Sequence, residues 1–453
     1  MPKEPWLEYA SELRVEVEQA YDEGLAFDRE AMQAEAESIL ALPPGPEREA
    51  RAVTFHERIA ASPMRADFPH HEPSDWPGIS ACLRGGDTPR PLPERGVLRD
   101  RLRGAWYGRI CGCLLGKPFE GWRSAKYYAF LKESGQYPLS RYASFDVSPA
   151  LRARLELGDI RTDSYLRSVS REHIDGMIED DDTNYTVLAL KLIEEKGAGF
   201  TPEDVAEFWL GNLPILHVYT AERIAYRNLV RLLSPPDSAR HVNPCREWIG
   251  AQIRADLYGY INPGRPRRAA EMAWRDASVS HVKNGIYGAM YVAAALALAL
   301  TENDLPAVLL GALDYIPPAS RLSEAIKEAF AWHDRYDFAG AYDALHRKWD
   351  ERNGHHWCHA VANAQIVVLA LLYGEGDFGR TICRAVDLLL DTDCNGATAG
   401  SILGALLGER AIPAAWTEPL HDRLLTGVAG YHEVSIAAMA EKTLGLIEEG
   451  SGK

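Results

Sequence analysis

Apolar residues recur at helical spacing along most of the chain, and segments with the two-residue period of a strand are scarce. The run "GFTPEDVAEFWL" shows a complete helix start, with Thr201 as the cap, Pro202 at the first helical position and Asp204 three residues after the cap. Helix-breaking residues interrupt the pattern at 43–47 and again between 70 and 96. The pattern predicts an all-α protein with a helical N-terminal extension, residues 1–95, and a larger multi-helix domain, residues 96–453.

Two of the expected helices carry a glycine at every fourth position. Such positions share one face of a helix, and each glycine costs roughly 1 kcal/mol relative to alanine, so the repeat needs a packing reason. A face without side chains lets two helix backbones approach closely. We therefore expect tightly crossing helices in a protein core, because apolar residues between the glycines argue against loops. The positions are Gly104, Gly108, Gly112 and Gly116, then Gly396, Gly400, Gly404 and Gly408, with a weaker version at Gly285, Ala289, Ala293 and Ala297.

Composition narrows the functional classes. The chain has 453 residues, 46% of them hydrophobic, and a formal net charge of −16, which argues against binding nucleic acid or an anionic membrane through a basic face. The N-terminus does not resemble a signal peptide, and the apolar run 291–300 is too short to span a bilayer. The seven cysteines form no CxxC pair. These features predict a soluble, reduced, cytoplasmic protein; they leave its oligomeric state open.

Four consecutive carboxylates, Glu179 to Asp182, precede an apolar helix in "EDDDTNYTVLAL". Helix capping explains one or two of them, but four adjacent like charges repel each other. A hard divalent cation, which takes carboxylate oxygens as ligands, is the alternative explanation. A second acidic pair, Asp391 and Asp393, precedes the second glycine helix. If the tight helices bring both clusters together, five carboxylates converge, and such a charge density requires a cation.

Four segments occur in order and together resemble the ADP-ribosylglycohydrolase family, which includes dinitrogenase reductase-activating glycohydrolase and the ADP-ribosyl-acceptor hydrolases. They are "RGAWYGRICGCLLGKPFE", "DDDTNYTVLAL", "SHVKNGIYGAMYVAAALAL" and "DTDCNGATAGSILGALLG", and the resemblance covers roughly residues 98–445. It implies a compact, orthogonal all-helical domain with two magnesium ions in a cleft, manganese being an alternative. The metal ligands that it implies are Asp180, Asp181, Asp182, Asp391, Asp393 and Cys394.

Two of these ligands depart from the family pattern. Asp180 stands where a hydroxyl residue is usual, and Cys394 replaces a ligating threonine. A protonated thiol is a poor ligand for a hard ion, so we expect the second metal site to be weaker or to be completed by another oxygen. The added charge of Asp180 could compensate.

The resemblance implies hydrolysis of an N- or O-glycosidic bond at the ribose anomeric carbon of an ADP-ribosylated protein or related ribosyl compound, a reaction that needs carboxylates and an activated water. Glu120 is the first candidate for proton transfer and Asp182 the second. The family's Gly-Asn-Gly…Met-Arg segment, which contacts ADP-ribose, was not found, and Tyr260 and Asn262 are expected in its place. The other expected substrate-binding residues are His281, Asn284, Gly285, Tyr287 and Asn395.

Three questions stay open at this level. The missing segment leaves room for hydrolysis of a small-molecule N-glycoside, or for a non-catalytic protein that binds ADP-ribose or a nucleotide. The helix that carries Glu222, Arg223, Arg227 and Asn228 can present either a solvated face or a substrate-lining one. His355 and His359 share a helical face, but no carboxylate stands nearby to complete a zinc site, so a structural role is favoured.

Overall fold

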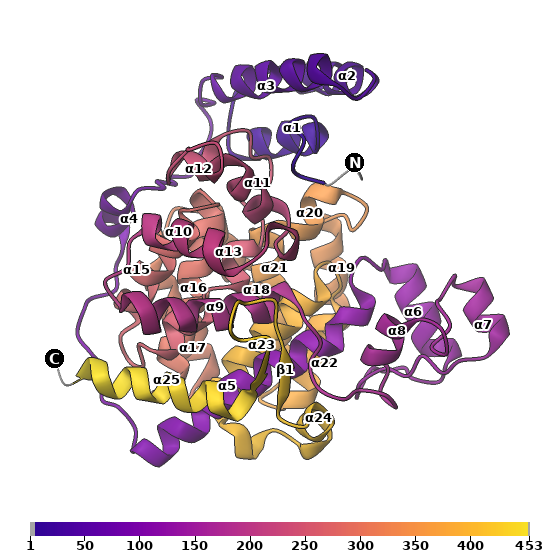
Figure 1. Cartoon of the computed structure of the whole chain (residues 1–453), viewed down its shortest axis with the longest axis vertical. Coiled ribbons are helices and arrows are strands. Elements are labelled where there is room, and N and C mark those ends of the chain that lie inside the picture. Colours follow the sequence, from indigo (N-terminus) through magenta and orange to yellow (C-terminus); the bar gives the residue numbers. More distant parts are fainter. Residues whose placement is uncertain (1–4, 452–453) are drawn as a thin grey trace.

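The structure, a computed structural model, describes residues 5–451 and is all-α, as the sequence predicts. Within that range the strands form one two-stranded antiparallel hairpin, β1 (Arg423–Leu425) with β2 (Glu433–Ser435). Figure 1 shows the body as a bundle of helices around α5 and α23, with α1–α3 above it. None of the helices in the described range is long and apolar enough to span a bilayer.

The body is built from long buried helices with shorter ones around them. The long ones are α5 (Arg95–Gly116), α9 (Asp181–Lys196), α16 (Lys283–Ala299), α18 (Arg321–Arg335), α21 (Ala360–Tyr373), α23 (Thr392–Leu407) and α25 (Ile436–Ser451). Around them lie α10 (Pro202–Asn212), α11 (Thr220–Leu229), α12 (Asp237–Arg240), α13 (Gly250–Ile253), α14 (Asp256–Tyr260), α15 (Pro266–Ala277), α17 (Leu305–Ala312), α19 (Phe338–Lys348), α20 (Gly354–Cys358), α22 (Phe378–Asp387) and α24 (Ala414–Thr417). A side lobe holds α6 (Ser124–Glu133), α7 (Pro149–Arg154) and α8 (Ser164–Val169) (Figure 1).

The two glycine helices, α5 and α23, pack against each other along their whole glycine faces. A Cβ atom added to Gly108 would overlap the backbone carbonyl of Gly400, and one added to Gly112 would overlap that of Gly396. The expectation of tightly crossing helices is thus confirmed, and the two strips prove to be each other's partners. The antiparallel register ends at Gly116, whose carbonyl oxygen accepts a 2.9 Å hydrogen bond from the Thr392 hydroxyl. The end of α5 is thereby held beside the start of α23.

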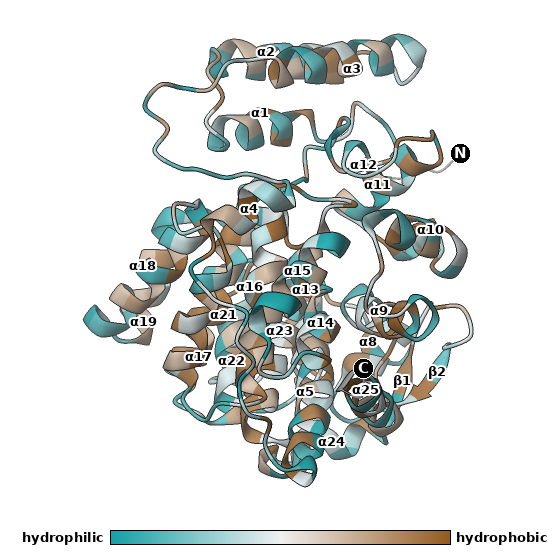
Figure 2. Cartoon of the chain, turned by 90° about the vertical axis from the view of Figure 1, so that its left-hand side faces the viewer, coloured by the Kyte–Doolittle hydropathy of each residue, from teal (hydrophilic) through white to brown (hydrophobic). Residues whose placement is uncertain are grey.

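The N-terminal extension forms a layer of its own on the body (Figure 2). The layer comprises α1 (Leu13–Asp22), α2 (Arg29–Leu40) and α3 (Pro46–Ala60), whereas α4 (Trp76–Cys82) packs on the body and adds Ile79 to its core. The first three helices enclose a small hydrophobic cluster that includes Leu13, Val17, Phe55 and Ile59, separate from the large core of the body. The boundary predicted near residue 95 falls at the start of α5.

Buried ionic groups attach the extension to the body. The Arg321 guanidinium donates hydrogen bonds of 2.7 Å both to Glu72, in the extension, and to Glu247, in the body. Gln19 of α1 donates to the same Glu247 carboxylate at 2.7 Å. Asn284 donates to Glu247 at 2.9 Å and to Glu72 at 2.8 Å. Extension and body therefore share one polar network in which each carboxylate has several donors.

This network predicts an acid-labile contribution to stability. Burial alone would raise the pKa of Glu247, but the charges of Arg321 and Lys283 and hydrogen bonds from Asn284 lower it to about 2. Because this pKa lies below the ordinary glutamate value of about 4.3, the stabilisation is complete above that value and is lost as the pH falls towards 2. We expect the free energy of unfolding, measured by urea denaturation, to decrease by about 3 kcal/mol over this window.

Glu247→Gln is the comparison for this measurement. The variant has no titrating group at this position, so its stability should vary less between pH 4.3 and 2 than that of the wild type. Equal pH dependence in the two proteins would contradict the assignment.

Candidate functional site

A cavity of about 550 Å³ opens where the C-terminal end of α5 meets the N-terminal ends of α9 and α23. The acidic side chains that line it include Asp180 and Asp181 from the start of α9, and Asp391 and Asp393 from the start of α23. The glycine-face packing of α5 on α23 brings Glu120, just beyond α5, to the same wall. The cavity also contains the aromatic side chains Trp6, Tyr219, Trp248 and Trp357.

The Lys117 ammonium joins the two acidic segments. Its Nζ atom contacts Asp180 closely and lies 3.5 Å from Asp393 Oδ2 and 3.7 Å from Glu120 Oε2. Glu120, Asp391 and Asp393 each offer an oxygen within 4.8 Å of the others. The two acidic motifs, about two hundred residues apart in the chain, are therefore brought together around one cation.

The crowded carboxylates perturb one another. Burial raises the pKa of Asp181, and the charges of Asp180 and Asp393 raise it further. Burial also raises the pKa of Asp391, together with the charges of Asp393 and Glu120. The Asp393 charge, followed by burial, raises the pKa of Glu120 to about 9, against the opposing charge of Lys117. Burial would also raise the pKa of Asp180, but Lys117 lowers it below its usual range. This electrostatic strain is what a divalent cation would relieve.

Asp180 performs one of the two roles that the sequence left as alternatives, the capping of α9, and its role as a metal ligand stays a prediction. Its Oδ1 caps α9 by accepting a 2.8 Å hydrogen bond from the Asp182 amide. Its buried Oδ2 forms a close ion pair with the Lys117 ammonium. Glu179, one residue earlier, pairs with His217 instead.

The residues present fit a divalent metal centre. The carboxylates of Asp180, Asp181, Asp391 and Asp393 place oxygen donors on one cavity wall, which is the donor chemistry that magnesium and manganese take. Cys394 also lines the cavity, and burial raises the pKa of its thiol well above the usual value. The neutral thiol is a poor ligand for such an ion, so an oxygen from another group is needed to complete the second position.

Asp182 lies beneath this wall and does not line the cavity. Its Oδ1 accepts a 3.1 Å hydrogen bond from Arg109, and its backbone carbonyl accepts one of 2.7 Å from the same guanidinium. Arg109 is itself fully buried and also donates to Asp256 at 2.9 Å. Asp182 therefore anchors the start of α9 to α5. One of its carboxylate oxygens also lies within 4.8 Å of ligand atoms of Asp393 and Cys394, so its role as a metal ligand stays a prediction.

The comparisons agree with this architecture. The sequence model described as ADP-ribosylglycohydrolase matches residues 94–450. The chain belongs to the ADP-ribosylglycohydrolase family. Its members are hydrolases, and this protein is an ADP-ribosylglycohydrolase-like hydrolase.

Among solved structures, one described as an ADP-ribosylglycohydrolase-related protein complex is similar, with a TM-score of 0.50 and 20% identity over 78% of this chain and 99% of that one. At this identity the likeness supports the fold alone. A comparison with curated proteins gave no match.

The substrate-binding residues expected from the ADP-ribosylglycohydrolase resemblance lie elsewhere. Tyr260 and Asn262 are buried behind the cavity, where the Tyr260 hydroxyl bonds Ser401 at 2.7 Å and Asn262 bonds the Tyr258 carbonyl at 2.8 Å. Asn284 and Tyr287 of α16 bind the extension instead, through Glu72 and the Pro73 carbonyl. None of these four residues lines the cavity, so their expected contact with substrate is corrected. For Asn284 and Tyr287 the reason is that α16 is apolar on every side, so its sequence did not indicate which face meets a cavity.

The remaining expected contacts are also internal. Gly285 packs closely on the Arg246 backbone carbonyl. Asn395 donates a 2.8 Å hydrogen bond to Asn363 and is fully buried. His281 is buried with its Nδ1 2.8 Å from the Ser280 hydroxyl and 3.8 Å from the Glu222 carboxylate, so it supports a cavity residue without lining the cavity.

The structure also shows which face α11 presents, and it adds cavity-lining residues that the sequence did not indicate. Glu222 lines the cavity while Arg223, Arg227 and Asn228 are buried, so α11 presents no solvated face here. Burial, opposed by Arg254, raises the pKa of Glu222 to about 7. Trp248, Ile249 and Gly250 form another part of the wall. One sequence signal could have indicated this wall. Residues 250–254 read "GAQIR", which begins with glycine and ends with an apolar residue and an arginine, as the family's Gly-Asn-Gly…Met-Arg segment does.

His355 and His359 receive a carboxylate partner from the extension, because Asp22 of α1 lies 3.2 Å from His355 Nε2. The hydrogen bonds to the two imidazole rings argue against a zinc site here. His355 Nδ1 accepts from the Trp248 indole and His359 Nδ1 from the Val361 amide, both at 3.2 Å, so each neutral ring carries its proton on Nε2. Neither ring has a free lone pair for a metal, and the group attaches α1 to α20.

Proposed function

We propose that the protein hydrolyses the N- or O-glycosidic bond at the ribose anomeric carbon of an ADP-ribosylated protein or a related ribosyl compound, with two magnesium ions. The convergence of Asp180, Asp181, Asp391 and Asp393 on one cavity wall is the observation that carries this proposal. Manganese is an alternative ion, because it takes the same oxygen ligands.

The side chains have separate tasks in this scheme. Bound at these carboxylates, divalent ions would supply Lewis acidity and a template for the ribose hydroxyls and the attacking water. Glu120 is the proposed proton-transfer residue, because its carboxylate lies on the cavity wall within 4.8 Å of oxygens of Asp391 and Asp393. Cleavage at an anomeric carbon develops positive charge on the sugar, and the surrounding carboxylates stabilise that charge.

Metal removal tests the proposal. We expect hydrolysis of a ribosyl substrate such as ADP-ribosyl-arginine in magnesium, a loss of at least about a hundred-fold after chelation with EDTA, and recovery on adding magnesium or manganese. Calorimetry supplies the second readout, namely binding of the ions themselves. Turnover that survives chelation, in a protein that binds no divalent ion, would overturn the proposal.

Lys117 provides a further prediction. Its ammonium contacts the same oxygens of Asp180 and Asp393 that a metal ion would use. We expect Lys117→Met to tighten magnesium binding about ten-fold in calorimetry, since a competing cation is removed. Lys126→Met, a lysine stacked on Trp122 away from these carboxylates, is the control and should leave the affinity unchanged. Weaker magnesium binding by Lys117→Met would show that the ammonium assists the site.

A further inference from the structure

Three thiol groups lie next to aspartates in or beside the cavity of about 550 Å³ (the acidic cavity). Cys358 and Cys394 line it, and the Cys358 sulfur lies 3.6 Å from Asp391 Oδ2. The sulfur of Cys113, which is fully buried, lies 4.0 Å from Asp182 Oδ2. A buried cysteine commonly fills space as a small apolar residue. A sulfur close to several carboxylates is, in addition, a potential metal ligand, and it prefers different ions from those that oxygen prefers.

Asp393 belongs to two groups of potential metal ligands. The oxygen group consists of Glu120, Asp391 and Asp393, and the sulfur group consists of Asp182, Asp393 and Cys394. Within each group the three ligand atoms lie within 4.8 Å of one another. The members of the sulfur group are all buried, with exposed fractions of 0%, 3% and 7% in that order. Two positions that share one carboxylate are typical of a two-metal centre, but here the two positions differ in their donor atoms.

Hydrogen bonds orient both aspartates of the sulfur group. Asp182 Oδ1 accepts a 3.1 Å hydrogen bond from the Arg109 guanidinium, whereas among the described residues its Oδ2 accepts only a long contact of 4.0 Å from a thiol. Asp393 Oδ1 accepts a 3.1 Å hydrogen bond from the Cys394 amide, and its Oδ2 lies 3.5 Å from Lys117, the cation that a metal ion would displace. Each aspartate therefore uses one oxygen to fix its orientation and has the other in a position to bind an ion.

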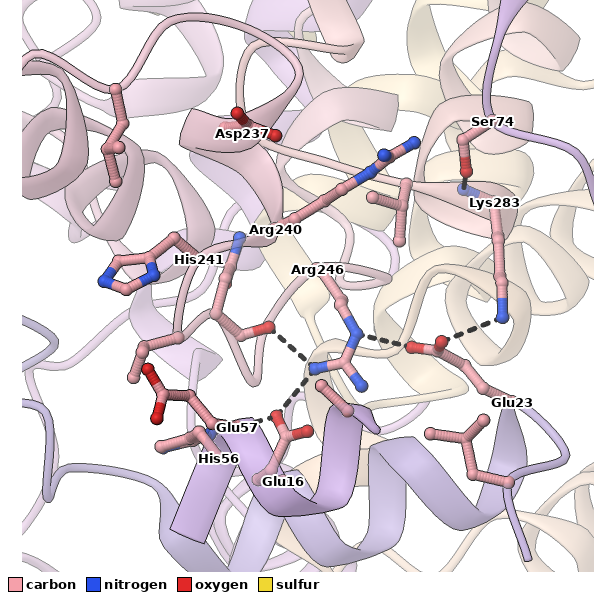
Figure 3. A pocket seen from close by; sticks show the side chains of 16 residues that line it. Glu16, Glu23, His56, Glu57, Ser74, Asp237, Arg240, His241, Arg246 and Lys283 are labelled. Carbon is pink, nitrogen blue, oxygen red and sulfur yellow. Dashed lines mark hydrogen bonds and ion pairs between the residues drawn. The ribbon is translucent and has the colours of Figure 1, made fainter. Parts of the chain in front are cut away.

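A second cavity shows what a charged cavity looks like when the chain supplies its own cations. It has a volume of about 560 Å³ and lies between α1, α3 and the body (Figure 3). Arg246 reaches Glu16 at 2.6 Å and Glu23 at 2.5 Å, and Lys283 reaches Glu23 at 2.8 Å. In the acidic cavity, by contrast, the carboxylates of the described lining residues outnumber the lysine and the histidine that face them. The acidic cavity is therefore the one that calls for an added cation.

The mixed donors of the sulfur group suit a thiophilic divalent ion. Zinc takes both cysteine sulfur and carboxylate oxygen, and its catalytic sites have three protein ligands and an open fourth position. Asp393 and Cys394 line the acidic cavity, so the open position would face its interior. A coordinated thiol gives up its proton, which passes to water as the ion binds. Magnesium gains little from sulfur, so the two kinds of ion should separate between the two groups.

From these observations we infer that Asp182, Asp393 and Cys394 form a site for a thiophilic divalent ion such as zinc, which binds there in preference to magnesium. The oxygen group keeps the preference for a hard ion. This inference rests on the proposed function only for the location of the metal centre, and it adds a selectivity that two equivalent magnesium ions would not show. Zinc and magnesium should therefore compete for one position and not for both.

Cobalt(II) is the probe for this site, because it takes the same ligands as zinc and, unlike zinc, absorbs light. The full-length chain is freed of metal with EDTA, kept reduced and titrated with cobalt(II). We expect a sulfur-to-cobalt charge-transfer band in the near ultraviolet, which an excess of zinc abolishes and an equal excess of magnesium does not. Carboxylate ligands alone do not give this band, so its absence from the wild-type protein would overturn the inference.

Cys394→Ser replaces the sulfur by an oxygen at nearly constant size. We expect it to lose the charge-transfer band and to bind zinc at least about a hundred-fold more weakly in competition with a chromophoric chelator, while its magnesium affinity changes less than about three-fold. The matched control is Cys358→Ser, because Cys358 lines the same cavity but belongs to neither ligand group, and it should keep the band. Circular dichroism checks that both variants are folded. A band that persists in Cys394→Ser, or one that depends equally on both thiols, contradicts the inference.

These results can be separated from the fate of the proposed function, because the band and the zinc affinity are measured without substrate. Magnesium-dependent hydrolysis by a protein that shows no cobalt–thiolate band overturns this inference alone. A band that behaves as expected, in a protein that hydrolyses no ribosyl substrate with any divalent ion, supports this inference and counts against the proposed function.

Discussion

Replacing Asp393 with asparagine should lower kcat/KM at least about a thousand-fold, the loss expected when a ligand central to a metal-dependent site is removed. Asp393 is 3% exposed, its carboxylate lies 3.5 Å from Lys117, and it lies within 4.8 Å of ligand atoms of both Glu120 and Asp391. Asp393 therefore lies between the residues at the end of α5 and those at the start of α23. The amide keeps the shape of the side chain but lacks the charge, so calorimetry should show magnesium binding weakened at least about a hundred-fold.

The same variant should remain folded. Removal of one carboxylate relieves repulsion among the others, so Tm in EDTA should be equal to or higher than that of the wild type, while the increase in Tm caused by magnesium should be lost. The matched control is Asp387→Asn, a buried aspartate at the end of α22, where burial raises the pKa to about 6. It lies outside the cavity and should leave magnesium affinity unchanged. Full magnesium affinity in Asp393→Asn would remove this residue from the site.

The second large effect concerns Gly112. We expect Gly112→Ala to lower the free energy of unfolding by about 3 kcal/mol or to prevent folding, because its Cβ would overlap the backbone of Gly396 and neither helix can yield locally. Thermal or urea denaturation followed by circular dichroism measures the change. Separation of α5 from α23 also displaces the two acidic segments, so any folded fraction should bind magnesium more weakly.

Gly211→Ala is the control for that measurement. Gly211 also lies in a helix, α10, but a Cβ there meets open space and the residue is exposed. Alanine should stabilise the protein slightly, by about 0.5–1 kcal/mol. If both variants behaved alike, helix propensity rather than close backbone contact would explain the glycine repeat.

The sequence predicts the structure best where the chemistry of a residue type permits only one kind of environment. Glycine every four residues in α5 and α23 permits only a close helix contact, and that contact is present. The two acidic segments were expected to converge, and Asp180 and Asp393 do meet at Lys117, while the divalent ion itself stays a prediction. Agreement ends with the substrate contacts, because Tyr260 and Asn284 are polar groups whose direction depends on neighbours distant in the chain. Their partners, Ser401 and Glu72, could not be inferred from local spacing.

The sequence by itself determined the helical class, the two glycine faces and the two acidic segments, since each follows from local periodicity or from charges adjacent along the chain. Only the tertiary structure decided that Lys117 lies between the acidic segments, that Arg109 holds Asp182, and that Trp6 and Glu12 line the cavity. The physical reason is that local spacing specifies which groups share a helix face. Which surfaces then pack together depends on contacts between distant segments, such as those that Arg246 and Glu247 make with α1, more than two hundred residues earlier in the chain.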